Sequence, residues 1–304
     1  MNTPPRGRGT GLVPDNRYSD VQREDDDDGW TDADAAGLDR PPATVLRIDT
    51  AKTVISRNSS PDVPFSASIN PYRGCEHGCS YCFARPTHAY LGLSPGLDFE
   101  TQLAWKPDAA QRLREELSAP GYRPAPIALG VNTDAYQPVE RRLGLTRALL
   151  EVLCETRHPV SIVTKGALIE RDIDLLAELA RDNLVQVMFS VTTLDAELAR
   201  RMEPRATGPA RRLAAMRTLH EAGIPVGVLC APLIPALNDH ELEAILAEAR
   251  AAGAQSAGYV LLRLPLEVAD IFQDWLAHHY PGRSAHVMSL LRRAATAFRP
   301  CRRQ

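Results

Sequence analysis

From residue 60 onward, short runs rich in β-branched residues alternate with longer runs whose apolar residues recur every three or four positions. The short runs predict strands, and the longer runs predict amphipathic helices that each bury one face. The predicted strands are 65–72, 127–133, 160–165, 184–192, 225–234 and 257–264. The predicted helices are 108–117, 143–156, 171–182, 210–222, 239–252 and 266–279.

This alternation is typical of βα units built around a parallel sheet. Gly223 and Gly253 stand just after two predicted helices, where a left-handed C-cap favours glycine, and Pro225 opens the next strand. We therefore predict an α/β fold in which six parallel strands form a curved, partly closed, TIM-like (β/α)6 barrel over residues 60–280. In parallel barrels, ligands bind at the carboxyl ends of the strands.

The composition indicates a globular chain with one large core. The 304 residues are 44% hydrophobic and 24% charged, and they contain no run of about 18 apolar residues that would span a membrane. The first residues lack the apolar stretch of an export signal. We therefore expect a cytoplasmic protein that does not bind a membrane.

The net charge of −3 is unevenly distributed. Residues 1–40 contain ten acidic side chains and five arginines, and the run 24–28 is entirely acidic. Such a segment has too few aliphatic residues to build a core, so we expect residues 1–45 to be a disordered acidic tail. The rest of the chain is nearly neutral and gives no charge argument for a nucleic-acid partner, which the sequence allows but does not indicate.

Three cysteines in one short segment give the strongest chemical signal. Cys75, Cys79 and Cys82 have the spacing C-x3-C-x2-C, and Tyr81 directly precedes the last of them. Three thiolates this close together suit three irons of a cubane iron–sulfur cluster and leave the fourth iron open to a small molecule. A zinc site would need a fourth ligand, for which His77 is the available side chain.

The remaining cysteines, Cys154, Cys230 and Cys301, are isolated along the chain, which argues against a disulfide framework. Cys154 lies on a predicted helix and Cys230 in an apolar strand, so we expect both to be small buried side chains. Three unligated thiols in the 75–82 segment are the remaining alternative to a cluster or a zinc site.

Polar residues stand at the ends of several predicted strands. The second strand runs into Thr133 and Asp134, the third ends at Lys165, and the fourth carries Ser190 and Thr192 on one face by the strand period of two. Such groups are not expected in a core. They are placed where a parallel barrel binds its ligands.

The segment Asn-Pro-Tyr-Arg-Gly-Cys-Glu-His-Gly-Cys-Ser-Tyr-Cys-Phe at 70–83 resembles the cluster-binding loop of the radical S-adenosylmethionine (SAM) superfamily. Four strand-end phrases resemble its spore photoproduct lyase-like branch: Thr-Asp at 133–134, Thr-Lys at 164–165, Phe-Ser at 189–190 and Ala-Pro at 231–232. Three further phrases are similar to an uncharacterised bacterial group in that branch: Asn-Thr-Asp-Ala-Tyr-Gln-Pro at 132–138, Thr-Thr-Leu-Asp at 192–195 and Glu-Pro-Arg at 203–205.

The resemblance covers about residues 60–280 and implies the partial barrel, with the cluster loop directly after its first strand. Residues 281–304 fall outside it. We expect them to form a C-terminal helix or tail that is truncated or diverged, because related proteins continue further.

The resemblance also implies a cofactor set and a reaction. Cys75, Cys79 and Cys82 would hold a [4Fe–4S] cluster, and SAM would chelate the fourth iron. An electron from a donor such as flavodoxin or ferredoxin would then cleave SAM to methionine and a 5′-deoxyadenosyl radical, which abstracts hydrogen from a substrate. We expect a lyase-like or transferase reaction on a substrate that the sequence does not identify.

Positions matching the family motifs imply the SAM contacts. Thr133, Lys165 and Ser190 would contact SAM, with Lys165 pairing with its carboxylate and Ser190 bonding its ribose hydroxyls. The backbone around Tyr81 would meet the adenine, and Ala231 would pack beside it.

Three further residues are candidates for catalysis. Asp134 and Tyr136 would either reach the substrate or lock their own loop. Arg205 would either clamp an anionic group bidentately or form a structural salt bridge with Glu203 or Asp195.

The lyases of this branch repair a thymine dimer in DNA, but this chain departs from them at two positions. They carry a hydrogen-donating cysteine where this chain has Val131, and a tyrosine where it has Phe83. A shared fold does not replace a missing donor, so we expect a different substrate. DNA repair is one alternative function, and a non-catalytic iron–sulfur electron relay, which would not need polar strand ends, is another.

Overall fold

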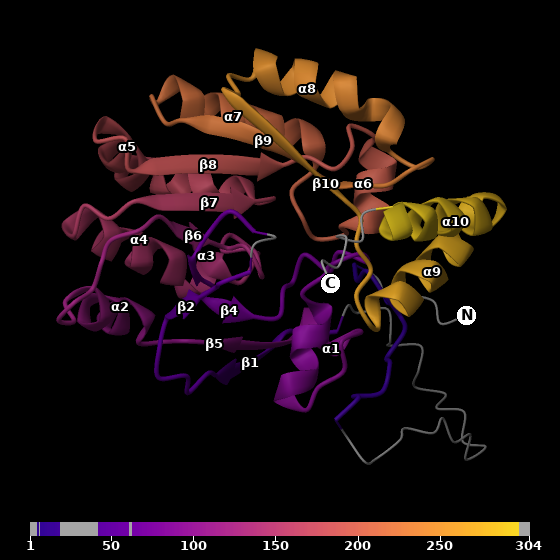
Figure 1. The fold of residues 1–304 in the computed structure, drawn as a ribbon, viewed down its shortest axis with the longest axis horizontal. Helices are drawn as coiled ribbons and strands as arrows, with labels where there is room; N and C mark the ends of the chain where they lie inside the picture. Colours follow the sequence, from indigo (N-terminus) through magenta and orange to yellow (C-terminus); the bar gives the residue numbers. More distant parts are fainter. Residues whose placement is uncertain (1–4, 6, 19–41, 61–62, 298–304) are drawn as a thin grey trace, which may run out of the picture.

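The computed structural model describes residues 5, 7–18, 42–60 and 63–297, and its centre is a seven-stranded sheet (Figure 1). The strand order is β10-β9-β8-β7-β6-β3-β2. Neighbouring strands from β3 to β10 run parallel, and β2 pairs antiparallel with β3. The strands are β2 (Ile55–Arg57), β3 (Ala67–Ile69), β6 (Ile127–Leu129), β7 (Val160–Thr164), β8 (Val185–Ser190), β9 (Val226–Leu233) and β10 (Ser256–Leu261).

The predicted α/β fold with six parallel strands is therefore confirmed. Within the described ranges, β2 and β10 stand at the two edges of the sheet, so the barrel is open on one side. Helices pack along its outer face through an apolar stripe; in α4, Leu149, Leu150 and Leu153 are fully buried. These helices are α2 (Ala109–Leu117), α4 (Leu145–Glu155), α5 (Ile173–Arg181), α7 (Pro209–Glu221) and α8 (Leu242–Ala251). Two shorter helices, α3 (Glu140–Leu143) and α6 (Ala196–Met202), follow β6 and β8.

The predicted strand 65–72 is interrupted at Pro71, where the chain leaves the barrel for the cysteine segment. Proline has no N–H to donate to a strand ladder, so pairing ends there. The neighbouring Asn70 stabilises the loop after β6 instead, because its side-chain oxygen accepts the Asn132 N–H at 2.9 Å. The residues after the break join a second, smaller sheet. Its order is β1 (Val45–Ile48), β5 (Gln102–Trp105) and β4 (Tyr72–Arg73).

Two helices after the last barrel strand, α9 (Val268–His279) and α10 (Pro281–Ala297), lie side by side (Figure 1). A second apolar cluster joins them to the barrel through Tyr81 of the cysteine segment and Met202 at the end of α6. The described residues also form short helical turns. They are α1 (Asp98–Thr101) and the 3-10 turns at Arg85–Leu91, Ala167–Asp172 and Asp239–Glu241.

The N-terminal strap, residues 7–18, packs on the body of the protein. Arg8 and Thr10 are buried, and the Asn16 side chain donates to the carbonyls of Ala89 and Leu93. At its far end, Arg17 forms a 2.7 Å ion pair with Glu267, just before α9. The expected disordered tail therefore does not extend over this stretch. The acidic run 24–28 lies outside the described residues.

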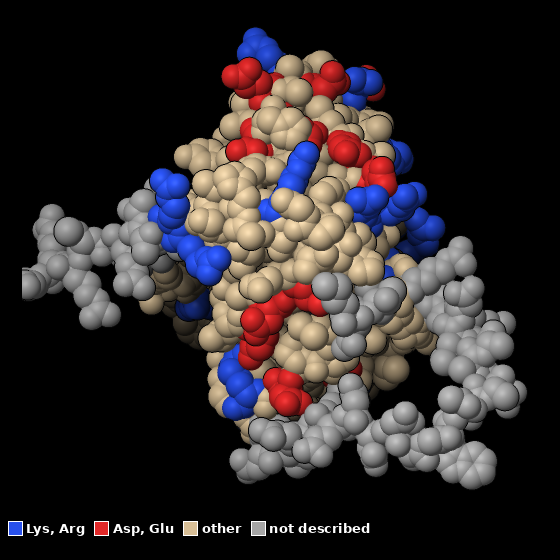
Figure 2. All heavy atoms as spheres, turned by 90° about the vertical axis from the view of Figure 1, so that its right-hand side faces the viewer, with Lys and Arg blue, Asp and Glu red and all other residues tan. Residues whose placement is uncertain are grey.

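Among the described residues, no helix combines the length and the apolar character needed to cross a bilayer. Figure 2 shows the face that carries α9 and α10, where acidic and basic side chains are interspersed around a largely uncharged area. On that face the described residues form no continuous basic stripe of the kind that tracks a nucleic-acid backbone.

Candidate active site

The three cysteines lie on a tightly coiled loop directly after the first barrel strand. Gly74 and Gly78 have φ of +81° and +66°, a conformation that glycine adopts without strain. The Cys75 N–H donates to the Phe99 carbonyl at 2.9 Å, and the Cys82 N–H donates to the Cys79 carbonyl at 3.2 Å. The loop, residues 74–83, is called the cluster loop below.

The thiols of the cluster loop are free, largely buried and close enough to influence one another. Burial raises the pKa of all three, that of Cys79 to about 12, and the neighbouring thiolates Cys79 and Cys82 raise the pKa of Cys75 further. The free thiols are therefore protonated at neutral pH, and a bound metal would deprotonate them.

Three cysteine thiols in one loop are the donor type that holds iron–sulfur clusters. Among the described residues, no group of three or more His, Cys, Asp or Glu side chains is placed to hold one metal ion. His77, the alternative zinc ligand, is instead directed at Asp134, with Nδ1 3.4 Å from Oδ2. In a cubane cluster each thiolate binds a different iron, so three thiols spread along one coil suit it.

A buried ion pair supports the cluster loop from the barrel side. Glu203, which follows α6, accepts hydrogen bonds from the Tyr81 hydroxyl and from Thr192 Oγ1, the latter at 2.6 Å, and forms an ion pair with Arg212 of α7. Burial alone would raise the pKa of Glu203, but Arg212 and Lys165 outweigh it and hold the pKa at about 2. Glu203 is therefore a carboxylate at any physiological pH.

A second buried ion pair supports the same loop from the outside. Arg85 donates from Nε to the Cys79 carbonyl at 2.9 Å and pairs with Glu100 at 2.5 Å. The other Glu100 oxygen accepts the Gly9 N–H of the N-terminal strap at 2.9 Å. A Cβ on Gly9 would lie 1.6 Å from the Gly78 carbonyl oxygen, so the strap backbone lies directly against the cluster loop.

Polar groups at the ends of β7, β8 and β9 meet beside the cluster loop. Lys165 Nζ donates to Ser190 Oγ at 2.7 Å, and Ser190 Oγ donates to the Ala231 carbonyl at 3.0 Å. The same Nζ lies 5.9 Å from the centre of the Tyr81 ring. Its charge also lowers the pKa of the Cys79 and Cys82 thiols, against the larger effect of burial. The structure thus brings Tyr81, Lys165, Ser190 and Ala231 together.

Comparison with known proteins decides the family. The model of the radical SAM superfamily matches residues 69–249, which include the cluster loop and the strands β6 to β9. The chain belongs to the radical SAM superfamily. An uncharacterized protein of Mycobacterium tuberculosis is 40% identical over 233 residues, which are 76% of this chain and 68% of that protein. An uncharacterized protein of Methanocaldococcus jannaschii is 27% identical over 213 residues, 70% of this chain and 76% of that protein.

Solved structures of spore photoproduct lyase share this radical SAM fold. One lyase mutant, with bound AdoMet and dinucleoside spore photoproduct, has a TM-score of 0.56 at 16% identity, and another has a TM-score of 0.57 at 17% identity. Both matches cover 78% of this chain and 66% of the lyase chain. The predicted similarity to the lyase-like branch is therefore confirmed for the fold, and this chain spans about two thirds of the lyase length.

In this radical SAM chain, the side chains of Thr133 and Asp134 bond to neighbouring elements of the fold. Thr133 Oγ1 donates to the Tyr72 carbonyl at 2.7 Å. Asp134 accepts from Thr164 Oγ1 and from the Lys165 N–H, both at 2.7 Å. Asp134 thus ties the loop after β6 to the end of β7. Tyr136 is 2% exposed and belongs to the main apolar core.

Arg205 does not form the predicted salt bridge with Glu203 or Asp195. Its guanidinium lies 3.3 Å from Glu76 of the cluster loop. The backbone N–H of Arg205 donates to the His77 carbonyl at 3.3 Å. Glu203 is already paired with Arg212, and the Asp195 side chain caps α6 by accepting two backbone N–H groups. The proximity of Glu203 and Arg205 in sequence was misleading, because their side chains pair with different partners.

No pattern in the sequence marked Arg85, Glu100 or Arg212. Arginine and glutamate are usually exposed, so their burial is visible only in three dimensions. Arg85 and Arg212 are the largest fully buried side chains among the described residues. Apolar residues next to them in the sequence would not have revealed them either, because their ion-pair partners lie nine or more positions away.

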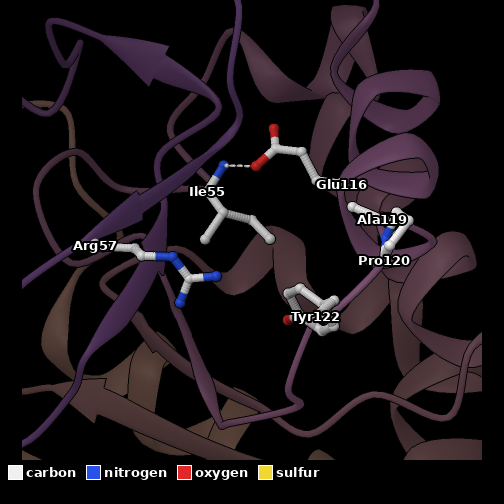
Figure 3. A pocket seen from close by; sticks show the side chains of 7 residues that line it. Ile55, Arg57, Glu116, Ala119, Pro120 and Tyr122 are labelled. Atoms are coloured by element: carbon white, nitrogen blue, oxygen red, sulfur yellow. Dashed lines mark hydrogen bonds between the residues drawn. The ribbon is translucent and has the colours of Figure 1, made fainter.

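A surface hollow lies elsewhere, between β2 and the end of α2 (Figure 3). Arg57, Glu116 and Tyr122 line it, and the Glu116 carboxylate already accepts the N–H groups of Val54 and Ile55. Residues 119–122 of its wall precede β6, so the hollow is displaced toward the amino ends of the strands, away from the cluster loop. We assign it no role in the chemistry.

Proposed function

We propose that this chain is a radical SAM enzyme that holds a [4Fe–4S] cluster on Cys75, Cys79 and Cys82 and cleaves SAM reductively. The observation that supports the proposal best is the position of Lys165. Its ammonium lies 5.9 Å from the centre of the Tyr81 ring in the cluster loop and donates to Ser190 Oγ at 2.7 Å. An iron–sulfur relay would have no use for a cation and hydroxyl groups at the strand ends, so this arrangement favours SAM binding over the relay.

When bound, the cluster would supply the electron that cleaves SAM to methionine and a 5′-deoxyadenosyl radical, which abstracts hydrogen from the substrate. The chain's own groups would orient SAM. Lys165 would bind its carboxylate, Ser190 its ribose hydroxyls, and the backbone around Tyr81, packed near Ala231, its adenine. Thr133, whose hydroxyl already donates to the Tyr72 carbonyl, would contact SAM from the second strand end.

The substrate is proposed to differ from that of the lyases. Val131, directly after Gly130 at the end of β6, offers no thiol hydrogen, and Phe83, next to Cys82, offers no phenol hydroxyl. Phe83 is 55% exposed, so its ring is available to a substrate or partner but not as a hydrogen donor. We therefore propose hydrogen abstraction by the radical without thymine-dimer repair, with flavodoxin or ferredoxin as the class of electron donor.

The test is anaerobic reconstitution of the whole chain with iron and sulfide, followed by reduction with dithionite in the presence of SAM. We expect a brown protein that forms 5′-deoxyadenosine and methionine. Cys79→Ala should abolish iron uptake, whereas Cys154→Ala, which alters a thiol on α4 far along the chain, should leave it unchanged. A brown protein that leaves SAM intact would support the electron relay, and a colourless one would reject both.

A further inference from the structure

We propose that Glu203 and Arg212 are positioning residues for SAM, because their buried ion pair joins the cluster loop to the strand-end groups that would bind it. The inference rests on the function proposed above and adds a role that the resemblance does not assign to Glu203 or Arg212. The protein buries this ion pair without any ligand: Glu203 is 2% exposed and Arg212 is 1% exposed.

Both carboxylate oxygens of Glu203 already accept hydrogen bonds from groups of the protein. One carboxylate oxygen accepts from the Tyr81 hydroxyl and from Thr192, and the other accepts from Arg212. A carboxylate with its oxygens used in this way fixes its donors rather than binding SAM directly. The donor that matters is Tyr81, because the backbone next to it would meet the adenine. Glu203 therefore determines where that backbone lies.

Arg212 extends the same support to β8. Its Nη1 donates to the Ser190 carbonyl at 2.8 Å, and its Nε donates to the Thr207 carbonyl at 2.5 Å. Ser190 in turn accepts from Lys165 Nζ. One guanidinium on α7 thus fixes the main chain of the residue whose hydroxyl would bind the ribose.

Lys165 is the third group that the pair orients. Its Nζ lies 2.7 Å from Ser190 Oγ and 4.0 Å from a Glu203 oxygen, and its side chain is only 16% exposed. An exposed lysine side chain samples many rotamers in water, so fixing one of them when SAM binds would cost conformational entropy. Here the ammonium is already held at the strand ends by a hydroxyl and a carboxylate. An incoming SAM carboxylate would therefore meet a preorganised cation.

A purely structural role for the pair is the competing explanation, and the chain contains a matched control for it. Tyr72, Glu140 and Arg171 form a second tyrosine–glutamate–arginine triad: the Tyr72 hydroxyl donates to Glu140, which pairs with Arg171 at 2.7 Å. Glu140 is as buried as Glu203, and the link from its triad to the proposed SAM groups is the Tyr72 main-chain carbonyl, which accepts from Thr133 and is unchanged in Tyr72→Phe. Removal of a tyrosine hydroxyl has the same chemistry in both places.

The experiment compares Tyr81→Phe with Tyr72→Phe, and Glu203→Gln with Glu140→Gln, in the reconstituted full chain. Each variant is assayed for iron per chain, for the dissociation constant of SAM from its effect on the electron paramagnetic resonance signal of the reduced cluster, and for KM and kcat in 5′-deoxyadenosine formation. We expect Tyr81→Phe to keep its iron and to weaken SAM binding on the order of tenfold, as for other supporting residues around a metal site. Tyr72→Phe should bind SAM like the wild type.

The outcomes separate the possible explanations. Wild-type SAM affinity in Tyr81→Phe, with full iron, would overturn the inference, and so would equal weakening in Tyr72→Phe. If Glu203→Gln loses its fold, the Tyr81→Phe comparison decides alone, because it leaves the ion pair intact. A wild-type chain that takes up no cluster would instead reject the proposed function, on which the inference depends.

Discussion

Two buried arginine–glutamate pairs hold the cluster loop from opposite sides, and they contact different parts of it. The outer pair, Arg85 with Glu100, binds main chain: Arg85 donates to the carbonyls of Cys79 and Gly96, and Glu100 accepts the Gly9 N–H. The inner pair, Arg212 with Glu203, is built around side chains of the site, with Glu203 accepting from the Tyr81 hydroxyl.

The difference indicates separate tasks for the two pairs. Contacts to main-chain carbonyls fix the path of the loop and thereby the positions of its thiols, so the outer pair should control whether a cluster is held. Contacts to the Tyr81 hydroxyl and to Thr192 do not hold the main chain that carries the thiols; they fix the groups around a ligand. A buried ion pair often adds little stability over apolar packing, whereas removal of one partner is strongly destabilising.

The largest expected effect follows from breaking the outer pair. Arg85→Met would leave Glu100 buried and unpaired and would free the Cys79 carbonyl. We expect a loss of about 3–5 kcal/mol in the free energy of unfolding, together with loss of iron binding. Urea unfolding and iron analysis measure the two effects. Arg114→Ala, which breaks an ion pair with Glu155 on the surface, is the control and should change neither. Retention of a full cluster by Arg85→Met would contradict the task assigned to the outer pair.

Lowering the pH should destabilise the outer side of the cluster loop, where Arg85 and Glu100 lie, before the inner side, where Glu203 and Arg212 lie. His88 is fully buried beside the Phe99 ring, its Nε2–H donates to the Gln102 carbonyl at 2.9 Å, and burial lowers its pKa to about 4. The unfolded chain would protonate this histidine near pH 6.5, so the unfolded state binds more protons between these values and stability falls as pH drops from 6.5 to 4. The shift corresponds to about 3 kcal/mol. Glu203, with a pKa of about 2, stays charged throughout this range.

His88→Gln removes the titrating group, so its unfolding free energy should depend less steeply on pH between 6.5 and 4 than that of the wild type. Urea unfolding at several pH values gives both slopes. Parallel slopes for the two proteins would show that His88 already carries a proton in the folded state.

A smaller effect is expected where the N-terminal strap meets the loop. In Gly9→Ala the new methyl group would clash with the Gly78 carbonyl, so the strap must move. We expect a loss of about 1–3 kcal/mol, as for other overpacked contacts, and faster bleaching of the reconstituted cluster in air. Gly282→Ala, at a position with no atoms within 4 Å of the added carbon, is the control. Equal bleaching rates would mean that the strap does not shield the cluster.

The sequence predicted those parts of the fold that depend on local pattern. The run 160–165 and the observed β7 agree to one residue because alternation and β-branching persist over the whole strand. The small second sheet was missed, because β1 is mostly exposed and β4 has two residues, too few for a periodic signal. The strap was missed for another reason: its contacts reach from Gly9 to Glu100, 91 positions away, and composition alone favoured disorder.

The same division holds for the candidate site. The spacing of the three cysteines and the strand-end position of Lys165 are visible in a linear sequence, and the structure places them in one region. Their roles toward a cluster and SAM stay predictions. The two buried arginines were invisible, because nothing in a linear sequence distinguishes a buried guanidinium from an exposed one. Residues that support a site are therefore harder to predict than those that form it.

Substitution of Arg205 has the smallest expected effect, and it tests whether the contact between Arg205 and Glu76 also supports the cluster loop. The Arg205 side chain is 31% exposed and its guanidinium lies 3.3 Å from Glu76. This contact is too long and too solvated for a strong ion pair. Arg205→Ala should therefore lower the unfolding free energy by less than about 1 kcal/mol and leave iron content and SAM affinity unchanged. If the variant nevertheless loses turnover of a substrate, once one is in hand, the exposed guanidinium is the anion clamp. A loss of iron would instead make it a structural partner of the loop, like Arg85.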